Sequence, residues 1–141
     1  MRNISILYPV FVLAFWTVLV LLLVPVARFR AALRREVGVE DFRFGESSRV
    51  PPAVSIPNRN YMNLLELPVL FYVVCLIIHT SGTTGPASLA LAWTYVALRL
   101  VHSAIHLTYN NVIHRLAAFA TSNVVLVVLW ILAAVRVTAS A

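Results

Sequence analysis

The chain has 141 residues, of which 61% are hydrophobic and only 11% are charged. Soluble domains carry about 25% charged residues, and a soluble domain of this length has too little interior to bury so much apolar surface. The composition therefore excludes a soluble globular domain and predicts an integral membrane protein whose apolar surface is covered by lipid.

Four continuous apolar runs follow one another along the chain, at about residues 4–27, 61–78, 89–107 and 116–135. Each run approaches or reaches the roughly 20 residues that an α-helix needs to cross the hydrocarbon core. None shows the alternation of apolar and polar residues that is typical of barrel strands. The first run is too long for the core of a signal peptide, and no small-residue cleavage site follows it. We therefore predict a single all-α domain, a four-transmembrane-helix bundle.

The formal net charge is +6, and all eleven basic residues are arginines. Seven of them lie between the first two runs, at about residues 28–60, and one lies between the last two runs. The early part of residues 28–60 is expected to continue the first helix beyond the lipid, and its later, proline-punctuated part is expected to be a loop. The positive-inside rule places both arginine-bearing connections in the cytoplasm and both termini on the non-cytoplasmic side. The arginines flank apolar runs, so we interpret them as orienting the chain in a membrane, with no nucleic acid as partner.

Polar side chains form one face of the second run. Arg59, Asn63 and Glu66 lie at i, i+4 and i+7, so a helix presents a guanidinium, an amide and a carboxylate in succession. Glu66 is the only acidic residue in any of the four runs, and polar groups at such positions require a partner or a function. Pro68 follows closely and is expected to kink the helix beside them.

The third run carries a matching polar stripe at spacings of 4, 3, 4 and 3, made of Tyr95, Arg99, His102, His106 and Tyr109. One interpretation is purely structural, with Arg99 paired to Glu66 and the histidines bonded across the bundle. A second interpretation starts from the excess of arginines over this one carboxylate near the cytoplasmic side. Such an excess favours an anionic ligand, because arginine binds carboxylates with paired hydrogen bonds. The arginines concerned are Arg28, Arg30, Arg59, Arg99 and Arg115.

Other chemistry has little support in the sequence. His102 and His106 stand four residues apart, but no glutamate follows the first of them as it does in a zinc-protease helix, and we expect no metal. Cys75 is the only cysteine, so we expect no intrachain disulfide. It lies within an apolar run, where it is expected to be a small buried or lipid-facing hydrophobe, with a reactive thiol as the alternative.

The spacing Arg59-x-x-x-Asn63-x-x-Glu66-x-Pro68, at the start of the second of four spans, resembles the signature of the MAPEG family, the membrane-associated proteins in eicosanoid and glutathione metabolism. The resemblance covers nearly the whole chain and is closer to bacterial members than to the mammalian synthases. It implies a homotrimer, a multi-pass location in the bacterial inner membrane, and glutathione bound as a cosubstrate between subunits near the cytoplasmic face.

The resemblance also implies roles for individual residues. Arg59, Asn63 and Glu66 match the motif that grips glutathione, and Arg115 is the nearest candidate for an arginine that stabilises the glutathione thiolate. Further glutathione-binding candidates lie at the basic end of the first helix and on the polar face of the third, where histidines replace the tyrosines of several family enzymes. These candidates are Arg28, Arg30, Arg99, His102 and His106.

The function implied is a glutathione-dependent membrane transferase or peroxidase, acting on hydrophobic electrophiles that arrive through the bilayer. One alternative is a non-catalytic membrane protein that binds a lipid or an acidic metabolite in the same pocket. Another is a scaffold in which Glu66 and Arg99 merely pair. A proton-coupled exchanger is a more distant alternative, since a lone membrane glutamate can carry protons, although the first span contains no acidic residue.

Overall fold

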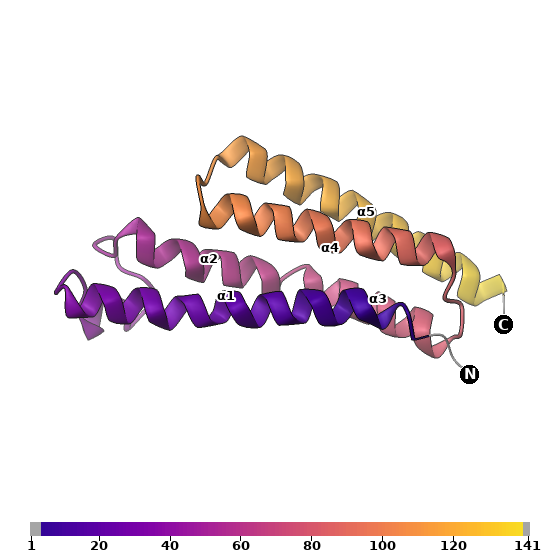
Figure 1. Ribbon diagram of the computed structural model, residues 1–141, viewed down its shortest axis with the longest axis horizontal. Helices are drawn as coiled ribbons and strands as arrows, with labels where there is room; N and C mark the ends of the chain where they lie inside the picture. The colour runs from indigo at the N-terminus through magenta and orange to yellow at the C-terminus, as the bar shows by residue number, and fades with distance from the viewer. Residues whose placement is uncertain (1–3, 140–141) are drawn as a thin grey trace.

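The computed structural model describes residues 4–139. Their helices are α1 (Leu7–Leu33), α2 (Pro52–Leu65), α3 (Pro68–Thr80), α4 (Pro86–Leu107) and α5 (Val112–Ala139), with a short 3-10 helix, η1 (Val39–Phe42), between α1 and α2 (Figure 1). Because α2 and α3 continue one another across the break before Pro68, four helical segments are long and apolar enough to cross a membrane. The prediction of an all-helical chain with four such spans is confirmed.

The helix starts follow from local side-chain chemistry. Proline occupies the first turn of α2, α3 and α4, where its fixed φ fits the helix and its missing N–H leaves no bond unmade. The start of α5 is capped by Asn111, whose Oδ1 accepts hydrogen bonds from the backbone N–H groups of Ile113 and His114 at 3.0 and 3.1 Å. Asn110, at φ 47°, ends the turn after α4 in the left-handed region that asparagine tolerates.

The structure differs from the predicted loop at residues 52–60, because α2 begins at Pro52 and these residues are helical. Pro57 does not stop the helix. The carbonyl that its missing N–H would have bonded belongs to Ala53, which is exposed in the first turn and accessible to water. The predicted extension of the first helix is present, since α1 runs through Pro25 and on to Leu33.

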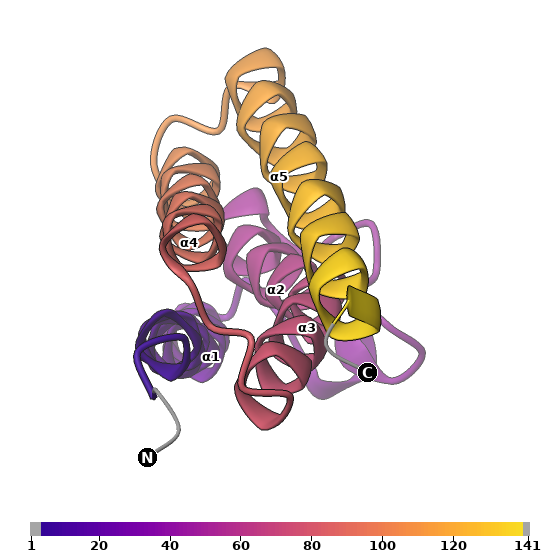
Figure 2. The same ribbon diagram turned by 90° about the vertical axis from the view of Figure 1, so that its right-hand side faces the viewer.

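The bundle consists of two pairs of neighbouring antiparallel segments. α1 packs beside α2 and α3, α4 packs along α5, and the pairs meet where α1 and α2 contact α4 and α3 contacts α5 (Figures 1 and 2). The start of α1 and the end of α5 lie at one end of the bundle, and the α1–α2 and α4–α5 connections lie at the other (Figure 1). The core includes the stacked rings of Phe71 and Tyr95, 4.6 Å apart, and the buried Cys75, so Cys75 is a core hydrophobe as predicted.

Large apolar side chains cover much of the outside of these helices. Phe15 on α1 and Val124 on α5 are 65% and 64% exposed, and many neighbours resemble them. Apolar surface of this extent is stable only against lipid or another protein surface. Together with the four apolar segments, it defines a multi-pass integral membrane protein.

The connection between α1 and α2 is a folded segment built around one carboxylate. Asp41, which is buried, accepts hydrogen bonds from the backbone N–H of Gly38 at 2.9 Å and from the Ser47 hydroxyl at 2.7 Å. Arg49 lies 3.2 Å from the same carboxylate. These hydrogen bonds, the one from Gly38 above all, hold the pKa of Asp41 below its ordinary value.

Candidate functional site

The polar face of α2 forms one wall of a cavity of about 480 Å³. Arg59, Asn63 and Glu66 line it in succession, as their spacing requires of a helix. α2 ends at Leu65, so Glu66 sits at the break between α2 and α3, where Pro68 begins the next helix. The break leaves the Glu66 side chain exposed at the edge of the cavity.

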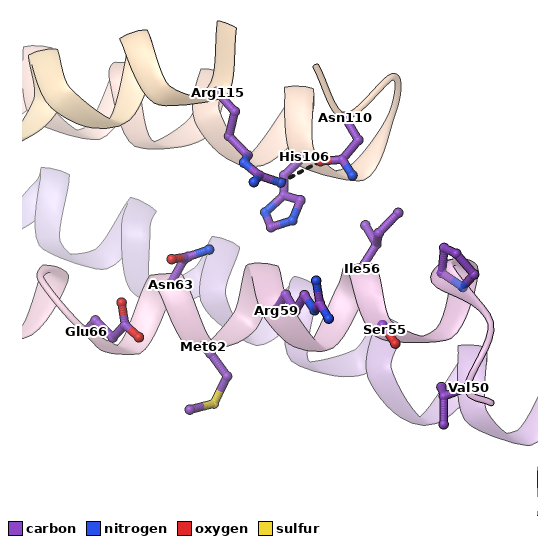
Figure 3. Close-up of a pocket in the computed structure, with 11 residues that line it drawn as sticks. Val50, Ser55, Ile56, Arg59, Met62, Asn63, Glu66, His106, Asn110 and Arg115 are labelled. Carbon is purple, nitrogen blue, oxygen red and sulfur yellow. Dashed lines mark hydrogen bonds between the residues drawn. The ribbon is translucent and has the colours of Figure 1, made fainter. Parts of the chain in front are cut away.

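The opposite wall comes from the end of α4 and the start of α5. His106 and Arg115 project from these helices toward α2, and Asn110 lies in the turn between them (Figure 3). Arg115 Nη1 donates a hydrogen bond to Asn110 Oδ1 at 2.6 Å, which fixes one arm of the guanidinium and leaves the rest of the group beside the cavity. Residues far apart in the sequence therefore face one another across a single hollow.

The charges around this cavity do not balance. It is lined by two guanidinium groups, Arg59 and Arg115, and one carboxylate, Glu66. Within residues 4–139 the ion pairs join other residues, all in or beside the α1–α2 connection, and none links Glu66 to an arginine. The side chains of the α2 face are thus available to a ligand.

Arg99 lies behind this wall. It is fully buried, its Nη2 donates a hydrogen bond to the backbone carbonyl of Asn63, and its guanidinium lies 5.6 Å from the centre of the Phe119 ring. The direct Glu66–Arg99 ion pair of the structural interpretation does not form among the described residues, and Arg99 meets α2 at the Asn63 carbonyl instead. Glu66 acts on Arg99 only through its charge. Arg99 does not line the cavity.

His102 and His106 have separate surroundings although both are on α4 and both are buried. His106 lines the large cavity, whereas His102 lines a neighbouring hollow of about 210 Å³ together with Val112, Leu116 and Phe119. Asn63 and Arg115 line both, so the two spaces adjoin. His102 Nδ1 lies 3.0 Å from the backbone oxygen of Arg115.

The two candidates on α1 lie elsewhere in this subunit. Arg28 lies 3.5 Å from Glu46 and 4.6 Å from the centre of the Phe42 ring, and it borders an apolar hollow between α1 and η1. Arg30 borders a different hollow, beside Ala53. Neither residue lines the cavity formed by α2, α4 and α5, so a role in binding glutathione stays a prediction that depends on a neighbouring subunit.

One buried polar cluster was not predicted from the sequence. Ser103 Oγ accepts hydrogen bonds from Asn60 Nδ2 at 2.6 Å and from Trp16 Nε1 at 2.8 Å, so it links α4 to α2 and to α1. Ser103 lies between His102 and His106, and Asn60 directly follows Arg59. In the sequence, the available sign of this cluster was a hydroxyl and an amide, Ser103 and Asn60, directly beside residues of the two polar stripes. The cluster fixes how the Arg59 face of α2 meets α4.

No group of three or more histidine, cysteine, aspartate or glutamate side chains that could hold a metal ion occurs among the described residues. The cavity offers guanidinium, amide, imidazole and carboxylate groups instead. These groups suit an organic ion that carries carboxylates and an amine.

Fold and site together define a small multi-pass membrane protein with a cationic cavity at one end of its bundle. The model of the MAPEG family matches residues 6–135, essentially the whole chain, and the protein belongs to that family. Comparison with curated proteins and with solved structures gives no significant match.

Proposed function

We propose that the cavity binds glutathione and that the protein is a glutathione-dependent membrane transferase or peroxidase acting on hydrophobic electrophiles. The observation that carries this proposal is the meeting of the α2 face with His106 and Arg115 around one space. In that space the side chains of Arg59, Asn63 and Glu66 form no ion pair among the described residues.

The charges of glutathione complement those of the cavity. The tripeptide carries two carboxylates and one ammonium, and the cavity offers two guanidinium groups and one carboxylate. Arg59 suits a carboxylate, since guanidinium–carboxylate hydrogen bonds are both charge-assisted and bidentate. Glu66 suits the ammonium, and the Asn63 amide can donate to and accept from the peptide groups.

Arg115 is the candidate for stabilising the thiolate. A cation beside a thiol favours the deprotonated form, which is the nucleophile. Each unit by which the thiol pKa falls corresponds to about 1.4 kcal/mol of preferential stabilisation of the thiolate. The hydrogen bond to Asn110 holds the Arg115 guanidinium beside the cavity before any ligand arrives.

The adjoining hollow gives a place for an apolar acceptor. Val112, Leu116 and Phe119 line it, and it shares Asn63 and Arg115 with the larger cavity. An electrophile that reaches the hollow from the lipid would lie next to the thiolate. We further propose that the protein is a homotrimer whose cavity faces the cytoplasm, with Arg28 or Arg30 of an adjacent subunit completing the glutathione site.

The experiment is a titration of the detergent-purified full chain with glutathione by calorimetry, followed by an assay of conjugation to a chlorinated dinitroaromatic. We expect binding, turnover, and a loss of about 10²–10³ in kcat for Arg115→Met, typical of removing one charge-stabilising group. Arg43→Met is the matched control, because Arg43 is exposed and its side chain contacts Glu40 and Phe44, neither of which lines the cavity.

The non-catalytic alternative and the failure of the proposal have different outcomes in this experiment. Binding without turnover and without thiolate would identify the non-catalytic alternative, a binding protein for an acidic metabolite. Failure of the wild-type protein to bind glutathione at all would overturn the proposal.

A further inference from the structure

His106 lines the cavity, but the proposed thiolate chemistry assigns no role to it. It is the one imidazole among the described residues that line the cavity, it is 2% exposed, and Arg115 lines the same cavity. Its Nδ1 is buried without a hydrogen-bond partner. The ring nitrogen that a ligand can reach from the cavity is therefore Nε2.

The neighbouring histidine, His102, packs against the His106 ring. The Arg115 backbone oxygen next to His102 Nδ1 can only accept a hydrogen bond, so a neutral His102 carries its proton on Nδ1. His102 Nε2 is then an acceptor, and it too is buried without a partner. The two rings contact edge to face with their centres 5.9 Å apart. Neither of these two buried nitrogens bonds the other, and a proton on His106 Nδ1 leaves His106 Nε2 as the base directed to the cavity.

We propose that His106 is the general base that receives the glutathione thiol proton, with His102 as the positioning residue that holds the His106 ring through their edge-to-face contact. This inference rests on the proposed function. The S–H bond breaks, the proton passes to His106 Nε2, and the electron pair stays on the sulfur beside Arg115. The sulfur then forms the C–S bond at the acceptor carbon, chloride leaves with its electron pair, and the imidazolium loses its proton to water.

The charges that face His106 fit such a role. Arg59 and Glu66 reach the cavity from α2, Arg115 reaches it from α5, and Arg99 and His102 are on α4 itself. The cations oppose a permanently charged imidazole and also stabilise a thiolate. A base that is neutral before the reaction, beside cations that favour the ionised sulfur, is the arrangement that proton abstraction requires.

The test counts protons when glutathione binds. Calorimetry of the full chain in buffers of different ionisation enthalpy gives the number released, and the ultraviolet absorbance of the thiolate shows whether the sulfur ionises. In the wild type the thiolate should form with little proton release, because the negative charge of the new thiolate offsets the surrounding cations and lets the His106 imidazolium keep the proton. In His106→Asn either the thiolate absorbance is lost or one more proton is released to the buffer. His114→Asn is the matched control, since His114 is exposed and its ring contacts Tyr109.

Kinetic measurements provide a second test of the role of His106. We expect His106→Asn to lower kcat/KM by about 10²–10⁴-fold near neutral pH, the usual contribution of a general base, while the glutathione affinity stays within a few-fold. His102→Leu should give a smaller loss and shift the pH profile in the same direction. An unchanged proton count and an unchanged pH profile in His106→Asn would overturn the inference while glutathione binding still stands. If His106→Asn does not fold, His106→Gln takes its place, because it keeps a polar side chain of similar length. The proton count of the wild type also tests the inference without any variant. Release of a full proton to the buffer when the thiolate forms would show that His106 is not the base.

Discussion

The buried guanidinium of Arg99 donates a hydrogen bond to the backbone carbonyl of Asn63, one turn before the break between α2 and α3. A charged side chain of α4 is thereby attached to the main chain of α2, at a residue whose own side chain lines the cavity. Arg99 holds the site in shape without lining it.

Replacing Arg99 should therefore affect stability and the site together. We expect Arg99→Leu to lower the free energy of unfolding by about 1–3 kcal/mol, because the Asn63 carbonyl loses its partner. Glutathione affinity should fall as well. Denaturation by increasing mole fraction of sodium dodecyl sulfate, with calorimetry on the same samples, measures both. The control is Arg34→Leu at the exposed end of α1, with an expected change within about 0.5 kcal/mol. A loss of stability with full affinity would contradict the link to the site.

Replacing Glu66 should affect glutathione binding without affecting stability. It is exposed and forms no ion pair among the described residues, so Glu66→Gln should leave the free energy of unfolding unchanged. Affinity for glutathione should fall about tenfold, but affinity for an analogue without the amino group should not fall, because Glu66 is proposed to bind the ammonium. Calorimetry of both proteins with both ligands isolates the contact between Glu66 and the ammonium, by the same logic as a double-mutant cycle. Glu36→Gln, on the α1–α2 connection, serves as the control. Equal losses for both ligands would rule out an ammonium contact.

The Ser103 cluster should contribute to the stability of the bundle. Ser103→Ala leaves the donors of Trp16 and Asn60 without their acceptor, which should cost about 1–3 kcal/mol in the free energy of unfolding. Ser122→Ala is the matched control, since Ser122 is also fully buried but donates only within its own helix, to the Phe119 carbonyl. The control should lose clearly less in the same detergent denaturation experiment. Equal losses would show that Ser103 does not join the helices energetically.

Asp41 should make the α1–α2 connection sensitive to acid. Its folded-state pKa lies below the ordinary aspartate value of about 3.9, so its contribution to stability is complete above that value and is lost as the pH falls through the folded-state pKa. The protection of the Gly38 and Ser47 amides against hydrogen exchange, relative to the intrinsic rate at each pH, should therefore fall below about pH 4. Asp41→Asn should show fast exchange at neutral pH already. An acid response that persists in Asp41→Asn would assign it to another carboxylate.

The sequence by itself determined the number of spans and the composition of one wall of the site. Run length against bilayer thickness predicts four helices, and the i, i+4, i+7 spacing places Arg59, Asn63 and Glu66 on one face of any helix that contains them. The same residues carry the resemblance to the MAPEG family that the match over residues 6–135 confirms. All of these depend on local spacing, which a sequence displays directly.

Only the tertiary structure decided which polar groups meet. Arg99 donates to the Asn63 carbonyl and not to Glu66. A sequence does not show which backbone carbonyl will accept such a hydrogen bond, because every residue has one. His102 and His106 differ by about 40° of rotation and about 6 Å of height along α4, and that difference places them in separate hollows. Such partners depend on how each helix is rotated about its axis and shifted along it relative to its neighbours. The packing of the whole bundle determines both.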